Sequence, residues 1–141
     1  MRIRLPKGDW KRLTDQRVNR TALQRSRLVH WRSGQSEPEH VHPVSDQLLL
    51  VMEGRLHIQT GPHQLHVETG RLVWLPRQCR HRLRAGKEGC RFWEIIAPNR
   101  EPYQLSGALP AESEHVQATV YELSTNLTVP ASPDLRVEIL H

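Results

Sequence analysis

Three of the nine histidines have a spacing that could bring their side chains together. His40 and His42 are two positions apart, which places both on one face of an extended segment. Gln47 follows after a short bend and can bring an amide oxygen beside them, while His81 lies much later and alternates with Leu83. Imidazole nitrogens from two strands plus one oxygen would bind a divalent first-row metal ion and leave positions open for substrate or water. The alternative is that these are ordinary surface or core histidines.

The segments that must position these residues have the pattern of short strands separated by glycine and proline turns. Period-2 alternation of apolar and polar residues, rather than a helical stripe, runs through the middle of the chain. Many short strands with frequent turns predict an all-β sandwich or barrel. The predicted strands cover residues 26–32, 47–53, 55–60, 64–68, 72–75, 80–84 and 90–97, with a loop at 85–89, a last strand at 135–140, and either a helix or a strand at 111–123.

Charge divides the chain into three predicted parts: a basic N-terminal extension (1–25), a barrel core (26–100) and an acidic C-terminal extension (101–141) that packs on the barrel or on a partner subunit. Residues 1–32 carry ten basic and two acidic side chains, whereas 101–141 carries one basic and six acidic. The simpler interpretation is that the two ends lie near each other, in one chain or across a dimer. The alternative is an arm that binds anions or nucleic acid. No nucleic-acid motif accompanies the arginines, so we expect no nucleic-acid partner.

Length and composition narrow the class of protein. A chain of 141 residues with 37% hydrophobic residues can form one ordinary core. The longest apolar run, Leu48–Met52, is far too short to cross a bilayer, and the basic start lacks the apolar stretch of a secretory signal. The two cysteines, Cys79 and Cys90, form no C-x-x-C pair, which argues against a disulfide framework and a thiolate zinc site. We therefore expect a cytoplasmic protein with no membrane partner.

The strand at residues 47–52 is apolar on both of its faces. Leu49 and Val51 share one face with Gln47, and Leu48 and Leu50 share the other. A strand of this kind is covered on both sides. The outer cover could be another sheet, the terminal segments or a second subunit, and we favour a homodimer.

Two blocks of sequence around the histidines have a regular spacing of glycine, histidine and proline. The first block is Gly34-x5-His40-x-His42-x4-Gln47-x6-Gly54, and the second is Gly70-x5-Pro76-x-Gln78-x2-His81. In this order, and fifteen residues apart, they resemble the two motifs of the cupin superfamily. The resemblance covers about residues 26–100. It implies a single-domain jelly-roll β-barrel with less regular terminal extensions, and metal ligands at His40, His42, Gln47 and His81.

The chain departs from the usual cupin motifs at three positions. Gln47 stands where most cupins have Glu, Gln78 where Gly is usual, and Ala85 where Asn is usual. Three neutral imidazoles and a neutral amide would leave the full charge of the ion in place, which makes it a stronger electrophile toward an anionic ligand. In a rival register, Asp46 rather than Gln47 is the ligand. The cofactor is expected to be one divalent transition-metal ion, and these donors accept Zn, Ni, Mn, Fe or Cu.

The segment after the second motif bears on the function. Residues 92–101 resemble the closing strand of the small pectin-degradation cupins, which promote conversion of unsaturated uronates to linear keto forms and also carry Gln in the first motif. The resemblance assigns catalytic roles to Glu94, as a proton carrier, and to Arg100, as a partner for a substrate carboxylate. The alternatives are structural ion pairs. Ile96 replaces the aromatic residue that these cupins have between the two.

Three hypotheses about function follow from these residues. The first is a metal-dependent isomerase or lyase acting on a small anionic, sugar-acid-like ligand. The second is an Fe(II)-dependent oxygenase, because three histidines can hold iron with open positions. The third is a cupin that binds a small ligand without catalysis.

Overall fold

A computed structural model describes the backbone of residues 2–6, 19–20, 25–97, 104–105, 116–122, 128–132 and 135–140, and the side chains of 26–97 and 116–122. All regular elements within these ranges are strands. No helix long and apolar enough to span a bilayer occurs among the described residues. The strands are β1 (Arg2–Pro6), β2 (Asn19–Arg20), β3 (Arg25–Trp31), β4 (His40–Val41), β5 (Asp46–Thr60), β6 (His63–Glu68), β7 (Arg71–Leu75), β8 (Arg82–Ala97), β9 (Gln104–Leu105), β10 (Thr119–Glu122), β11 (Thr128–Ser132) and β12 (Leu135–Leu140).

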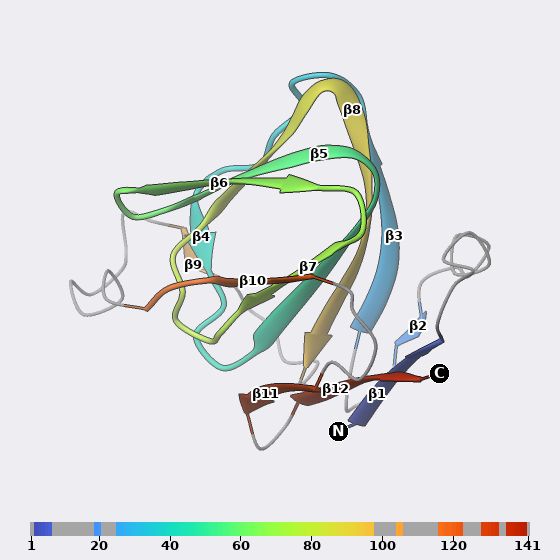
Figure 1. The fold of residues 1–141 in the computed structure, drawn as a ribbon. Coiled ribbons are helices and arrows are strands. Elements are labelled where there is room, and N and C mark those ends of the chain that lie inside the picture. Colours follow the sequence, from blue (N-terminus) through green and yellow to red (C-terminus); the bar gives the residue numbers. More distant parts are fainter. Residues whose placement is uncertain are drawn as a thin grey trace.

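The predicted all-β fold is confirmed, and its centre is a curved antiparallel sheet (Figure 1). Its strand order is β10-β7-β5-β8-β3-β2, and β6 pairs with the far half of β5. A three-stranded sheet of β1, β12 and β11 and a short β4–β9 pair complete the described strands. The stretch at 119–122, part of the segment that fitted either a helix or a strand, is a strand that pairs with β7.

Two long bent strands replace four of the predicted short ones. The segments 47–53 and 55–60 join in β5, because Gly54 has a positive φ of 73° and the chain continues through a bulge there. The predicted loop at 85–89 is wrong: these residues belong to β8, where Ala85 pairs with Leu56 and Cys90 with Gly54 on either side of a bulge. Gly89, with a φ of 81°, carries the chain through the bend. Glycine adopts these left-handed conformations without the steric cost of a side chain.

The register of β5 against its neighbours separates an inner from an outer face. Leu49 and Val51 lie in the hydrophobic core together with Phe92 of β8, and Gln47 shares their face. Leu48 and Leu50 lie on the opposite face and are also buried within this single chain. A second subunit is therefore not needed to cover them, and the homodimer stays a prediction that light scattering can test.

The two ends of the chain meet in the three-stranded sheet. β1 pairs with β12 in parallel, with Arg2 opposite Arg136 and Pro6 opposite Leu140. Figure 1 shows this strand pair below the barrel, with the N and C marks at its opposite ends, as parallel pairing requires. The predicted proximity of the basic and acidic ends is thus seen in the backbone pairing of the outermost strands.

Candidate metal centre

Backbone pairing brings the three histidines of interest together. His40, in β4, and His81, just before β8, form an antiparallel bridge with N–H···O distances of 2.9 Å in both directions. His42 is two residues further along the same extended segment. One ligand atom from each imidazole lies within 4.8 Å of the others. The ring centroid of His40 is 5.0 Å from that of His42 and 4.4 Å from that of His81.

Hydrogen bonds fix which nitrogen of the two paired imidazoles is available as a ligand. Nδ1 of His40 lies 2.8 Å from the Pro38 carbonyl, and Nδ1 of His81 lies 2.8 Å from the Cys79 carbonyl. A carbonyl only accepts, so Nδ1 donates its N–H and Nε2 carries the lone pair. Nε2 of His81 is buried and has no hydrogen-bond partner among the described residues. Backbone carbonyls orient metal-binding histidines in this way.

Burial keeps these imidazoles in the neutral form that binds metal. Burial lowers the pKa of His40, with a partial opposing effect from its bond to Pro38. It lowers the pKa of His81 well below the usual value, and the neighbouring His40 lowers it further. At neutral pH a metal ion therefore has no proton to displace from either ring.

The side chain of Gln47 is buried, and its amide is oriented by Glu94. Nε2 of Gln47 donates to Oε2 of Glu94 over 2.8 Å, while Oε1 has no hydrogen-bond partner among the described residues. Because the amide nitrogen is held by Glu94, the amide oxygen is left free to bind a metal ion. Asp46, the rival candidate, instead accepts a hydrogen bond of 2.8 Å from the backbone N–H of Arg77. The guanidinium of Arg77 also forms an ion pair with the Asp46 carboxylate.

Glu94 faces the barrel interior as expected, but its main partner was not foreseen. Arg27 of β3 stands directly opposite Glu94 of β8, and its Nε donates to Oε1 over 2.7 Å. Glu94 is only 3% exposed, so this ion pair offsets the cost of burying the carboxylate. The sequence does contain a hint of this pair. Arg27 is two and four residues before Val29 and Trp31, so in a strand its side chain lies on the same inward-facing side as theirs.

A second carboxylate, on Glu37, also lies at the centre and was missed. Its Oε1 is buried, is 3.7 Å from Nε2 of His40, and makes no hydrogen bond among the described residues. Burial raises the pKa of Glu37 to about 8; the Glu94 carboxylate adds to the rise, and Arg27 partly offsets it. Glu37 lies before β4 in a segment without alternating apolar and polar residues, so the sequence gave no indication of where its side chain would point.

The family of the chain follows from comparison with known sequences. A family model described as a cupin domain matches residues 27–96, the segment that contains all three histidines. This segment is a cupin domain. "Polyketide synthase CurC" of Streptomyces cyaneus is 30% identical over 95 residues, covering 64% of this chain and 62% of that protein. The chain thus spans less than two thirds of the length of this curated relative.

Solved structures share the cupin fold at low sequence identity. KdgF from Halomonas sp. has a TM-score of 0.56 at 17% identity, covering 60% of this chain and 78% of that one. A protein with a double-stranded β-helix domain from Klebsiella pneumoniae has a TM-score of 0.57 at 21% identity, covering 64% and 80%. Oxalate decarboxylase OxdC of Bacillus subtilis, as a deletion mutant, has a TM-score of 0.56 at 16% identity, covering 65% and 27%.

Two departures from the usual cupin motifs have visible structural effects. Gln47 donates to Glu94, and a carboxylate in its place would meet a second carboxylate at hydrogen-bond distance. Gln78, where Gly is usual, has a positive φ of 67° and is the only non-glycine with such a φ among the described residues. Its backbone N–H donates to the His42 carbonyl over 2.8 Å, which ties this turn to the histidine segment.

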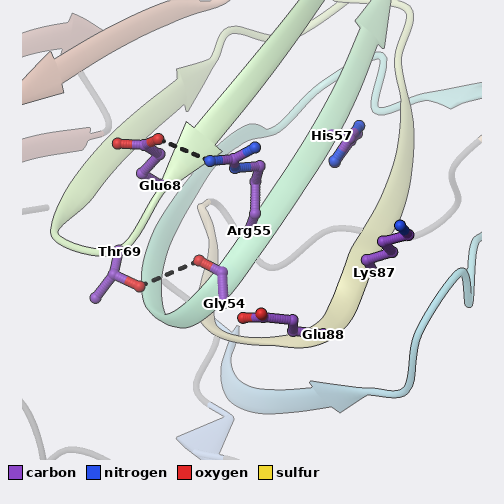
Figure 2. Close-up of a pocket in the computed structure, with 7 residues that line it drawn as sticks. All are labelled: Gly54, Arg55, His57, Glu68, Thr69, Lys87 and Glu88. Atoms are coloured by element: carbon purple, nitrogen blue, oxygen red, sulfur yellow. Dashed lines mark hydrogen bonds and ion pairs between the residues drawn. The ribbon is translucent and has the colours of Figure 1, made fainter.

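Arg100 and Cys79 add no side-chain contact to the three imidazoles in the described structure. Arg100 falls outside the described residues. Cys79 is a core residue, and burial raises the pKa of its thiol to about 12. A surface hollow of about 730 Å³ contains none of the histidines of the centre (Figure 2). In it Arg55 pairs with Glu68.

Proposed function

We propose that this cupin binds one divalent transition-metal ion and acts as an isomerase or lyase on a small anionic substrate. The ligands would be Nε2 of His40, His42 and His81 and Oε1 of Gln47. Two observations support the proposal: one ligand atom from each of the three imidazoles lies within 4.8 Å of the others, and the buried Oε1 of Gln47 has no hydrogen-bond partner among the described residues. Buried polar atoms of native proteins are nearly always satisfied, so Nε2 of His81 and Oε1 of Gln47 call for a partner.

The metal ion, when bound, supplies a Lewis acid that stabilises negative charge on a substrate oxygen. The chain's own contribution begins with the neutral ligand set, which leaves the positive charge available for an anionic substrate. The barrel walls contribute an apolar surrounding, since Leu49, which pairs with Glu94, is buried in the hydrophobic core with Val51 and Phe92. Charges interact more strongly in such a dry surrounding.

Glu94 is the proposed proton carrier. Its carboxylate accepts three hydrogen bonds, two from Arg27 and one from Gln47, which leaves about one lone-pair position for a proton of the substrate. The same bonds hold it in one orientation, as general acid–base catalysis requires. Arg100 is proposed to bind a substrate carboxylate through its guanidinium.

Two substrate classes are candidates. The fold similarity to KdgF, together with the resemblance of residues 92–101 to the pectin-degradation cupins, favours an unsaturated sugar acid. The curated relative named as a polyketide synthase protein favours an enolisable polyketide-like ketone. Both chemistries move a proton next to a carbonyl group, which is the step that Glu94 could serve.

The test is turnover of both substrate classes by protein loaded with each candidate metal. We expect product with the wild type and with His30→Ala, which removes an exposed histidine, and a loss of at least about 100-fold with His42→Ala and with Glu94→Gln. Full activity of Glu94→Gln would contradict the proton-carrier role. Oxygen consumption by the iron-loaded protein would replace the proposal with an oxygenase, and saturable binding with no product under any metal would replace it with a binding protein.

A further inference from the structure

A carboxyl group outside the predicted ligand set lies beside the histidines. It belongs to the half-buried Glu37, which is close enough to the buried Glu94 to interact with it. Glu94 is paired with the guanidinium of Arg27. Oε1 of Glu37, in contrast, makes no hydrogen bond among the described residues, so it is available to an ion held at the imidazoles.

The position of Glu37 relative to His40 is that of two ligands on one ion. Nε2 of His40 carries a lone pair, because Nδ1 donates to Pro38. Oε1 of Glu37 is 3.7 Å from that nitrogen, with no hydrogen bond between them. In a five-coordinate site, with angles of about 90–120° at the ion, two ligands about 2.1 Å from it are ~3.0–3.6 Å apart, slightly less than the separation seen here.

The backbone fixes Glu37 at this place independently of its side chain. Its N–H donates to the Leu83 carbonyl over 3.2 Å, and the adjacent Ser36 bridges to Arg84. The segment before the first histidine therefore runs beside the start of β8, directly after His81. The carboxylate itself has no bond at Oε1 to hold it, although its side chain is only 21% exposed.

We propose that Glu37 is a fifth ligand, which supplies the carboxylate oxygen that Gln47 does not. This inference rests on the metal site of the proposed function and adds a residue to it. Glu37 is not part of the group whose ligand atoms all lie within 4.8 Å of one another, so the proposal requires its side chain to turn toward the ion when the ion binds. The bound cation then has one negatively charged ligand. It comes from Glu37, in the segment before β4, rather than from position 47 of β5.

The experiment is a cobalt(II) titration followed by visible absorption and by calorimetry. The variants are Glu37→Gln, the matched control Glu39→Gln two residues away, and His42→Ala. We expect Glu37→Gln to bind at least about tenfold more weakly. Its d–d absorption per ion should also be stronger, because intensity rises as the coordination number falls. Glu39→Gln should match the wild type in both measurements.

The outcomes separate the two proposals. If Glu37→Gln binds cobalt with the affinity and spectrum of the wild type while His42→Ala has lost binding, the role of Glu37 is wrong and the metal site stands. If the wild type binds no cobalt, both fail. Circular dichroism of the metal-free variants checks folding. Glu37→Asp, which keeps the charge but shortens the reach, should bind more weakly than the wild type and more tightly than Glu37→Gln; equal binding by all three would also overturn the inference.

Discussion

Replacing Gln47 with Glu should destabilise the metal-free protein in a pH-dependent manner. Nε2 of Gln47 is 2.8 Å from Oε2 of Glu94, and both residues are buried. The substitution would place two carboxyl groups at that separation, and two like charges about 3 Å apart do not both ionise. One of the two would have to keep a proton in the folded state.

The cost follows from the pH. Keeping a proton on a carboxyl group whose usual pKa is about 4.3 costs about 1.36 kcal/mol per pH unit above that value. The penalty is therefore about 4 kcal/mol at pH 7 and about 1 kcal/mol at pH 5, before any relief from Arg27. The sign is that of a raised folded-state pKa in an acid: the unfolded state loses the proton first, so stability falls as pH rises above about 4.3.

The assay is urea unfolding of chelator-treated wild type and Gln47→Glu between pH 5 and pH 8. The double variant Gln47→Glu/Glu94→Gln restores an amide N–H opposite a carboxylate, and its stability relative to the wild type should lose the pH slope. A loss of stability that is the same at pH 5 and pH 7, or a slope that survives in the double variant, would refute the reasoning.

Three further predictions concern the turns and the thiols. Gln78→Gly should stabilise the protein by about 0.5–1 kcal/mol in thermal unfolding, because it relieves a left-handed backbone at Gln78; a destabilised variant would contradict this. Gly54→Ala should lower the free energy of unfolding by ~3 kcal/mol or more, because its Cβ would clash with the Gly89 carbonyl oxygen. In the control Gly70→Ala the Cβ meets nothing within 4 Å, so the loss should be only about 1–2 kcal/mol. Equal losses in the two variants would contradict this prediction. Burial raises the pKa of the Cys79 and Cys90 thiols to about 12, so a thiol reagent at pH 8 should label them only after unfolding, and rapid labelling of the native protein would count against their burial.

Local patterns in the sequence were enough to predict an all-β sandwich or barrel and the grouping of the histidines, and the resemblance to cupins selected the barrel. Alternation along 47–52 placed Gln47 on the inner face with Leu49, and the structure has both buried there. The two-residue spacing of His40 and His42 put them on one face, since an extended chain permits little else. The structure adds the bridge to His81 that brings the third ring to them.

Features that depend on pairing between distant strands could not be predicted. Arg27 meets Glu94 because β3 and β8 pair in one particular register, 67 residues apart in sequence. Glu37 reaches His40 through a non-periodic segment whose course is set by its bond to Leu83. The predicted loop at 85–89 failed for a related reason: Ala85 and Cys90, at the two sides of a bulge, both pair with β5, so the chain stays in one strand despite its glycines.

The central claim is that three imidazoles, two from one extended segment and one from just before β8, hold a single ion. Its most direct test is the metal content of the purified protein by mass spectrometry, with wild type beside His42→Ala and the surface control His30→Ala. The account predicts one transition-metal ion per chain in the wild type and in His30→Ala, and almost none in His42→Ala. A wild type that retains no ion after growth and dialysis in metal-supplemented buffer, or a His42→Ala variant with the same content, would contradict it.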